Sequence, residues 1–174
     1  MVKPAILPTN REVFFGENEI IVSKTDPTGR ITYANDVFLT ISGYTEAETL
    51  GQPHSFIRHP DMPRCVYRLL WDAIQAKGEI FAYVKNMTKT GDHYWVLAHV
   101  TASLDGAGTI LGFHSNRRRP KPAAVASITQ LYKSWKSIED NPSNRKDGLS
   151  ASYEHVSDML QQKGVSYDEF VLSL

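Results

Sequence analysis

The sequence has 174 residues, enough for one ordinary domain with a helical extension but not for two full domains. Lysine plus arginine and aspartate plus glutamate both total 19, so net charge gives no reason to expect nucleic acid, an anionic membrane or an acidic substrate as partner. Cys65 is the only cysteine, so no intrachain disulfide can form, and no apolar run approaches the roughly 18 residues that span a bilayer. We therefore expect a soluble, cytoplasmic protein.

The first part of the chain predicts an arm followed by a β-hairpin. Residues 1–17 form the arm, which prolines and Gly16 interrupt. Residues 19–35 then contain two short β-branched runs separated by Asp26-Pro27-Thr28-Gly29. This spacing is typical of a hairpin, because proline presets its backbone angle and glycine accepts a positive φ.

Helical signals occupy the next stretch. Residues 36–44 carry apolar side chains at helical spacing and end near Gly43. Thr45 and Glu48 match the capping box that begins a further short helix. Residues 63–78 predict a longer helix, with Pro63 in its first turn, where a missing N–H costs nothing.

Three strand-like runs follow, in residues 79–89, 93–104 and 109–117, with glycine-containing turns between them. Neighbouring strands can all pair antiparallel, and the helices that precede them can gather on one face of the sheet. The sequence thus predicts an α+β domain over residues 18–119, with a five-stranded antiparallel sheet.

Residues 120–174 predict a helical extension. An amphipathic helix is expected from residue 122 onward, and residues 139–148 are interpreted as a polar linker. A second helix ends at Gly164, and Ser166 with Glu169 forms another capping box before the last residues.

The run SFIRHPDMP, residues 55–63, concentrates polar chemistry and allows several interpretations. His54, His59 and Asp61 lack the regular spacing of a zinc site, and Ser55 lacks the G-x-S-x-G turn that exposes a nucleophile. One remaining interpretation is structural: Asp61 caps the following helix and Arg58 pairs with a carboxylate. The other is a receptor for an anion or a polar ring, built by an arginine beside two histidines at a helix start.

Two further features have an ordinary and a functional interpretation. The triplet Arg117-Arg118-Arg119 is interpreted as a solvated strand end in preference to a phosphate-binding patch. Trp71 and Trp95 are typical core aromatics, although the cleft between a curved sheet and its short helices also accommodates aromatic cofactors.

Five motifs together resemble one known family. ITYAND (residues 31–36), SGYT (42–45), GQPHSFIRHPDMP (51–63), VKN (84–86) and GDHYWV (91–96) resemble the PAS sensor domain of bacterial aerotaxis receptors. The resemblance covers residues 18–119, and the long run at residues 51–63 makes it specific. It implies a PAS fold and agrees with the order of strands and helices predicted above.

The resemblance also implies a cofactor, because in that family the PAS domain holds FAD non-covalently and reports redox state or respiratory activity. The residues that match family positions linked to flavin binding or signalling are Asn35, His54, Arg58, His59, Asp61, Trp71 and Asn86, and we add Trp95 as a further cofactor-binding residue. Arg58 can neutralise a pyrophosphate or a reduced flavin, and Asn86 can hydrogen-bond the polar edge of the ring.

Comparison with the related blue-light LOV domains concerns His54, Cys65 and His114. His54 stands where those domains carry their photoactive cysteine, and Cys65 lies eleven positions later, so no cysteinyl photoadduct is expected. The same alignment puts His114 near the position where LOV domains keep a glutamine close to flavin N5, and a histidine there could exchange a proton with a reduced flavin. The competing interpretation of His114 is a half-buried strand histidine.

We therefore expect a sensor and not an enzyme: a short stand-alone PAS protein that binds FAD and signals in trans. The partner is a chemotaxis component, another signalling protein or a second subunit, since the membrane anchor and coiled coil of aerotaxis receptors have no counterpart in this sequence. FMN remains possible. The alternatives are a haem-binding gas sensor that uses His54, His59, His93 or His99, and a cofactor-free dimerisation module.

Overall fold

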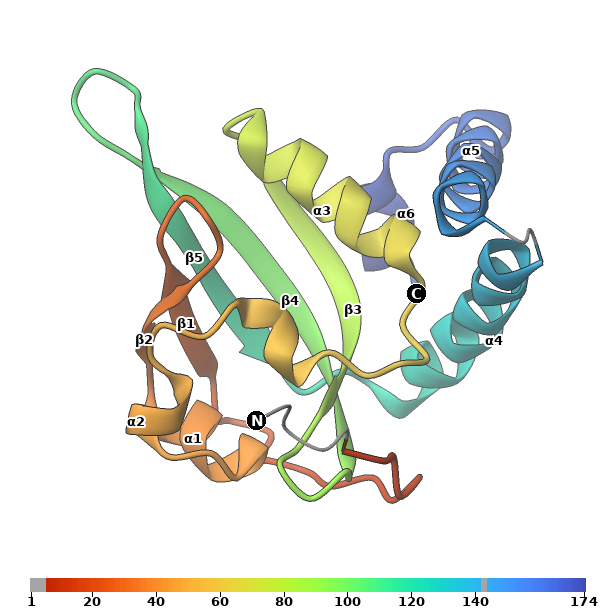
Figure 1. Cartoon of the computed structure of the whole chain (residues 1–174). Helices are drawn as coiled ribbons and strands as arrows, with labels where there is room; N and C mark the ends of the chain where they lie inside the picture. The colour runs from red at the N-terminus through yellow and green to blue at the C-terminus, as the bar shows by residue number, and fades with distance from the viewer. Residues whose placement is uncertain (1–5, 142–143) are drawn as a thin grey trace.

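A computed structural model describes residues 6–141 and 144–174 and shows a central antiparallel sheet with helices on one face and along one edge (Figure 1). The strands follow the order β2-β1-β5-β4-β3 in space, which confirms the predicted α+β class. The strands are β1 (Ile21–Thr25), β2 (Ile31–Ala34), β3 (Glu79–Met87), β4 (His93–Leu104) and β5 (Ile110–Arg118). The helices are α1 (Asp36–Ser42), α2 (Glu46–Thr49), the 3₁₀ turn η1 (His54–Ile57), α3 (Arg64–Gln75), α4 (Pro122–Asp140), α5 (Arg145–Lys163) and α6 (Tyr167–Leu172).

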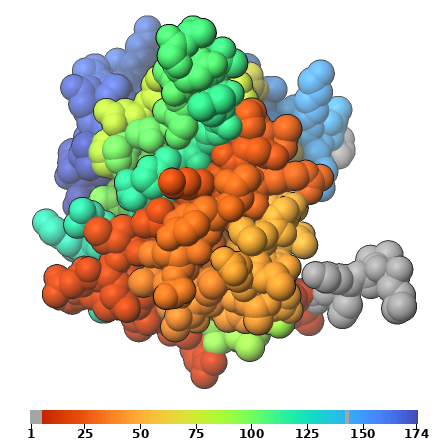
Figure 2. Space-filling view, turned by 90° about the vertical axis from the view of Figure 1, so that its left-hand side faces the viewer, coloured from red at the N-terminus to blue at the C-terminus, as the bar shows by residue number. Residues whose placement is uncertain are grey.

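Local signals define the first half of the fold. The Gly29 amide donates to the Asp26 carbonyl at 3.0 Å, and Gly29 has a φ of 82°, as the hairpin turn requires. Thr45 and Glu48 form both hydrogen bonds of the predicted capping box at α2. Figure 2 shows the β1–β2 hairpin with α1 and α2, in red to orange, below the green tip of the β4–β5 hairpin.

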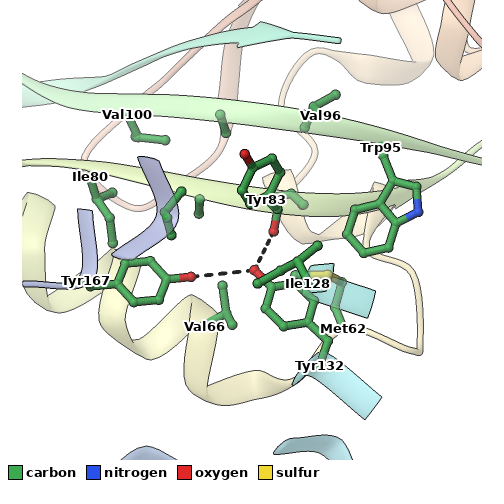
Figure 3. Close-up of a cluster of buried hydrophobic side chains, with 14 of the residues drawn as sticks. Met62, Val66, Ile80, Tyr83, Trp95, Val96, Val100, Ile128, Tyr132 and Tyr167 are labelled. Atoms are coloured by element: carbon green, nitrogen blue, oxygen red, sulfur yellow. Dashed lines mark hydrogen bonds between the residues drawn. The ribbon is translucent and has the colours of Figure 1, made fainter. Parts of the chain in front are cut away.

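The sheet edge formed by β3 is covered by the C-terminal helices. Asp168 of α6 accepts a hydrogen bond of 2.7 Å from the Phe81 amide. The Tyr132 hydroxyl of α4 donates to the Tyr83 carbonyl at 2.7 Å (Figure 3). Apolar side chains from α3, α4, α6, the sheet and the segment before α3 pack around the Tyr132 hydroxyl, among them Met62, Val66, Ile80, Ile128 and Tyr167. The extension is therefore part of the domain's core.

The opposite edge is also covered. On β2, the Ile31 amide donates to the Gln52 carbonyl at 2.9 Å, and the Ile31 carbonyl accepts from the Gly51 amide at 2.8 Å. The segment between α2 and η1 thus runs along β2 and forms backbone hydrogen bonds with the free edge of this strand.

The expected polar linker over residues 139–148 is mostly helix, so this prediction was wrong for its described part. Glu139 belongs to α4, and α5 begins at Arg145, with the Asn144 side chain accepting from the Lys146 amide as N-cap. Residues 142–143 lie outside the described residues, as do residues 1–5 of the arm. Gly148 allows α4 and α5 to approach closely, because a Cβ there would lie 2.0 Å from the Glu139 carbonyl oxygen.

Glu139 connects α4 to the start of α3. Its side chain is fully buried and accepts from the Cys65 amide at 2.8 Å, from Arg64 Nε at 3.2 Å and from the Ser152 hydroxyl at 3.0 Å. The first turn of α3 has no side-chain cap of its own, because Pro63 occupies the N-cap position. A carboxylate from α4 therefore satisfies an amide that the helix leaves unpaired.

None of the helices in the described ranges is long and apolar enough to cross a bilayer.

Candidate functional site

A cavity of about 240 Å³ lies between the inner face of the sheet, η1 and α3. Strands β1, β3, β4 and β5 form its floor, α3 forms one wall, and the β1–β2 turn with η1 forms the rim. The apolar part of the lining consists of Leu70, Trp71, Ile74, Val84, Ala98, Val100 and Phe113. The polar part consists of Ser23, Thr25, Thr28, His54, Ser55, Arg58, Tyr67, Asn86, Ser115 and Arg117.

Trp71 gives the cavity an aromatic wall. Its ring meets that of Phe113 edge to face, with 5.5 Å between centroids and 88° between planes. Gly29 of the β1–β2 turn lies against Trp71, since a Cβ at this position would lie 3.0 Å from the indole. The wall is thus built by α3, the hairpin turn and β5 together.

Arg58, the residue that directly follows η1, lines the cavity. Its guanidinium lies over the Tyr67 ring at 3.5 Å from the centroid, a cation–π contact that fixes its direction. The backbone of Arg58 also pairs with that of Asn86 on β3. The start of the run RHPDMP (residues 58–63) is thereby attached to the sheet, and Arg58 and Asn86 are held side by side.

Arg117, His54 and Ser23 form a second polar group. Arg117 Nη2 lies 2.6 Å from His54 Nε2 and 2.7 Å from the Ser23 hydroxyl oxygen. A guanidinium can only donate, so His54 Nε2 accepts and must be unprotonated. Burial and the neighbouring Arg117 charge lower the pKa of His54 to about 3, which keeps the imidazole neutral.

Sequence reasoning missed Arg117, which was interpreted as part of a solvated strand end. The structure corrects this: Arg117 is 4% exposed, whereas Arg118 next to it is exposed. Alternation along β5 is the signal that identifies it, since Phe113, Ser115 and Arg117 share the inner face.

Four buried polar atoms of the cavity residues have no hydrogen-bond partner among the described residues. They are Arg58 Nε, Asn86 Nδ2, Ser115 Oγ and Arg117 Nη1. Buried donors are ordinarily paired, because leaving one unpaired costs about 1–3 kcal/mol. All four atoms belong to residues that line one cavity beside an aromatic wall, and such a set of donors suits a planar ligand with several acceptor atoms.

The structure brings together four of the nine predicted site residues: His54, Arg58, Trp71 and Asn86. Asn35, His59, Asp61, Trp95 and His114 do not line the cavity.

Asn35 has a structural task. Its side-chain oxygen accepts from the amides of Phe38 (3.1 Å) and Val22 (3.0 Å), and its amide group donates to the Ile20 carbonyl at 2.8 Å. It therefore caps α1 and joins it to β1.

We expect Asn35→Ala to lower the free energy of unfolding by about 2–3 kcal/mol, because one cap and two further hydrogen bonds are lost. Urea denaturation of the two proteins measures this change. Asn35→Asp retains both acceptor bonds and should recover more than half of it. Equal stability of the alanine and wild-type proteins would contradict the assignment.

His59 and Asp61 contact other residues outside the lining of the cavity. The His59 ring is buried, packs against His93 with 5.6 Å between centroids, and accepts from the Asp61 amide at 3.1 Å. Burial and Lys85 lower the pKa of His59. Asp61 pairs with Lys85 at 2.7 Å and does not cap α3, so the structural interpretation was wrong about the cap. It was also wrong about Arg58, which stacks on Tyr67 and pairs with no carboxylate of the described residues.

Trp95 and His114 lie on the other face of the sheet. Trp95 packs against Tyr132 of α4, with 6.1 Å between ring centroids. His114 is half-buried and lies in register with Lys24 of β1 and Thr101 of β4. Its neighbours Phe113 and Ser115 line the cavity, so His114 projects away from it.

The other candidate ligands of a metal or haem are dispersed. Across residues 6–141 and 144–174, no three histidine, cysteine, aspartate or glutamate side chains gather as a metal site would require. His99 stacks on Phe81 on the outer face, with 4.3 Å between centroids. Cys65 is buried beside Glu139, where burial raises its thiol pKa to about 12, and it does not line the cavity.

Residues 31–116 match a family model described as the PAS fold. The chain contains a PAS domain. Its strand order and the short helices on the inner face agree with the fold that the sequence motifs implied.

Several known proteins are similar to this PAS domain. The aerotaxis receptor of Escherichia coli (strain K12) is 40% identical over 126 residues, which cover 72% of this chain and 24% of that receptor. Phototropin-1A of Oryza sativa subsp. japonica is 31% identical over 97 residues, 56% of this chain and 10% of the phototropin. The chain therefore spans a minor part of each of these relatives.

Solved structures share the fold. A light-oxygen-voltage domain from a study with a flavin analogue superposes with a TM-score of 0.57 at 20% identity, over 66% of this chain and 86% of that one. At 20% identity this likeness shows the fold alone.

Proposed function

We propose that the cavity binds a flavin, FAD, and that the protein reports redox state or oxygen-linked metabolism to a partner protein in the cytoplasm. The observation that carries the proposal is the set of unpaired donors on Arg58, Asn86, Ser115 and Arg117 around an aromatic-walled cavity. The similarity to the aerotaxis receptor supports the sensor class.

The residues fit the group in chemical type. An isoalloxazine ring offers carbonyl oxygens and ring nitrogens along one edge, and these can accept from Asn86 and the buried arginine donors. Its apolar edge and faces suit Trp71, Val84, Ala98 and Val100. A cavity of about 240 Å³ matches a ring system, so the phosphate-bearing end extends past the rim at Thr28, Pro53 and Ser55, which are exposed.

A bound flavin supplies electron acceptance and donation, and the chain's own residues supply binding and response. Tyr67, Leu70 and Trp71 of α3 line the cavity, while Arg64 and Cys65 at the start of the same helix hold Glu139 of α4. A change of ligand state that moves α3 therefore reaches α4 and α5 through one short helix.

We expect Asn86→Ala to raise the Kd for FAD roughly tenfold, because a buried hydrogen bond to a polar ligand is worth about 1–1.5 kcal/mol. Asn116→Ala is the matched control: Asn116 also lies on a strand but faces away from the cavity, so its Kd should equal that of the wild type. Quenching of flavin fluorescence on titration measures all three constants, and circular dichroism confirms folding.

The visible spectrum of the purified protein tests the proposal as a whole. The two absorption bands of oxidised flavin, bleached by dithionite, with FAD released on denaturation, support it. A Soret band indicates haem, and a haem ligand at His54 must first give up the bonds to Arg117 and Ser23. A colourless protein that refuses added FAD overturns the proposal and favours a cofactor-free interaction module.

A further inference from the structure

The charges lining the cavity do not balance. Arg58 and Arg117 both line it, and no acidic side chain does. In the part of the chain that the structure describes, the arginines with carboxylate partners are Arg11, Arg64, Arg68 and Arg119, which all lie elsewhere. The cavity thus holds two cations that no carboxylate of the described chain neutralises.

Of the two arginines, Arg117 has the greater need of an opposite charge. Arg58 is half-buried and stacks on Tyr67, which partly compensates its charge. Arg117 is 4% exposed, its Nη2 donates to the neutral groups Ser23 and His54, and its Nη1 has no partner in the described chain. An isolated buried charge is costly unless an opposite charge pairs with it.

The neighbours of Arg117 cannot provide that charge. The pKa of Tyr67 is raised to about 12 by burial, and burial also raises that of Tyr94, so both phenols are neutral near pH 7. The pKa of Arg117 is lowered to about 10 by burial, which still leaves the guanidinium protonated at neutral pH.

We infer that the cavity binds an anionic edge of its ligand, and that Arg117 supplies the positive charge opposite that edge. The inference rests on the proposed flavin function and adds a preference among ligand states. Oxidised flavin is neutral at its ring, whereas adding two electrons and one proton, the proton at N5, leaves a negative charge shared by N1 and the C2 carbonyl. Arg117 should therefore favour the reduced, anionic ring over the oxidised one.

The test is the two-electron midpoint potential of the FAD-loaded protein, with dithionite as electron donor and a reference dye. We expect the midpoint potential of Arg117→Met to be at least about 30 mV lower than that of the wild type. For a two-electron couple this shift equals a tenfold loss of preference for the reduced ring. Arg117→Lys keeps a cation at this place and should recover most of the difference. Arg118→Met, a neighbouring exposed arginine on the same strand, should match the wild type.

The dependence of the potential on pH separates charge from packing. With N1 deprotonated, one proton accompanies two electrons and the slope is about 30 mV per pH unit. The wild type should keep this slope to lower pH than Arg117→Met, because the cation disfavours protonation of N1. A role of Arg117 in packing alone does not move this transition.

The outcomes distinguish the two claims. A wild-type protein that binds no FAD overturns the proposed function and this inference with it. FAD binding with the same potential and pH slope in wild type and Arg117→Met overturns the inference alone. Should Arg117→Met not bind FAD, the wild type is compared with free FAD, and a transition at or above the pH found for free FAD counts against Arg117.

Discussion

Replacing Glu139 by alanine is expected to lower the free energy of unfolding by about 3–5 kcal/mol, the range found when one partner of a buried ion pair is removed. The Glu139 carboxylate is fully buried and binds Arg64, the Cys65 amide and Ser152, so α3 and α5 lose a common acceptor on α4 at once. Chemical denaturation followed by tryptophan fluorescence and circular dichroism measures the change.

Asp140 provides the matched control for Glu139. It is the next residue of α4, exposed, and paired with Lys136 one turn earlier, so Asp140→Ala should cost only about 0.5 kcal/mol. Glu139→Gln keeps the shape and one acceptor oxygen and should fall between the two. Equal losses for the alanine variants at 139 and 140 would show that the buried carboxylate does not hold α3, α4 and α5 together.

Acidification from pH 7 to pH 5 is expected to destabilise the flavin-free protein by about 2 kcal/mol through His54 alone. Burial lowers the pKa of His54 to about 3, against 6.5 for the unperturbed side chain. Between these values the unfolded chain binds more protons than the folded one, so stability rises with pH and falls as pH drops below about 6.5. His59 and His93 contribute in the same direction, because burial also lowers their pKa values.

His54→Gln isolates this contribution. Glutamine can accept from Arg117 but does not titrate, so the variant should lose about 2 kcal/mol less than the wild type over the same pH range. His155→Gln, on the exposed surface of α5, serves as the control and should retain the wild-type profile. Parallel stability curves for wild type and His54→Gln would mean that His54 does not stay neutral in the fold.

Local signals predict most of the domain correctly. The Asp26–Gly29 turn, the capping box at Thr45 and the glycine-bounded strands each depend on a few adjacent residues, and these were read correctly from the sequence. The helical character of residues 145–148 was missed, although Asn144 is a local N-cap signal. Gly148 is a poor helix former, and its close approach to the backbone of Glu139, nine positions earlier, is visible only in the tertiary structure.

The site shows the same division. His54, Arg58, Trp71 and Asn86 were predicted from the family resemblance, and all four line the cavity. Arg117 and His114 were interpreted without strand parity, although residues an odd number apart on one strand face opposite sides. Phe113 on the inner face is enough to place Arg117 inside and His114 outside. The role of Glu139 needs the tertiary structure, since 74 positions separate it from Cys65.

Both margins of the sheet are closed by the chain itself, and this restricts how another molecule can associate. On β3, Asp168 and Tyr132 occupy backbone groups that an incoming strand would need, and on β2, Gly51 and Gln52 do the same. Unpaired N–H and C=O groups of an edge strand are where a partner adds a strand to a sheet and where fibril formation by strand pairing begins. A binding partner must therefore contact side chains on the outer face of the sheet or on the helices. A chain cut before α4 should self-associate through the part of β3 around Phe81 and Tyr83, which the C-terminal helices cover.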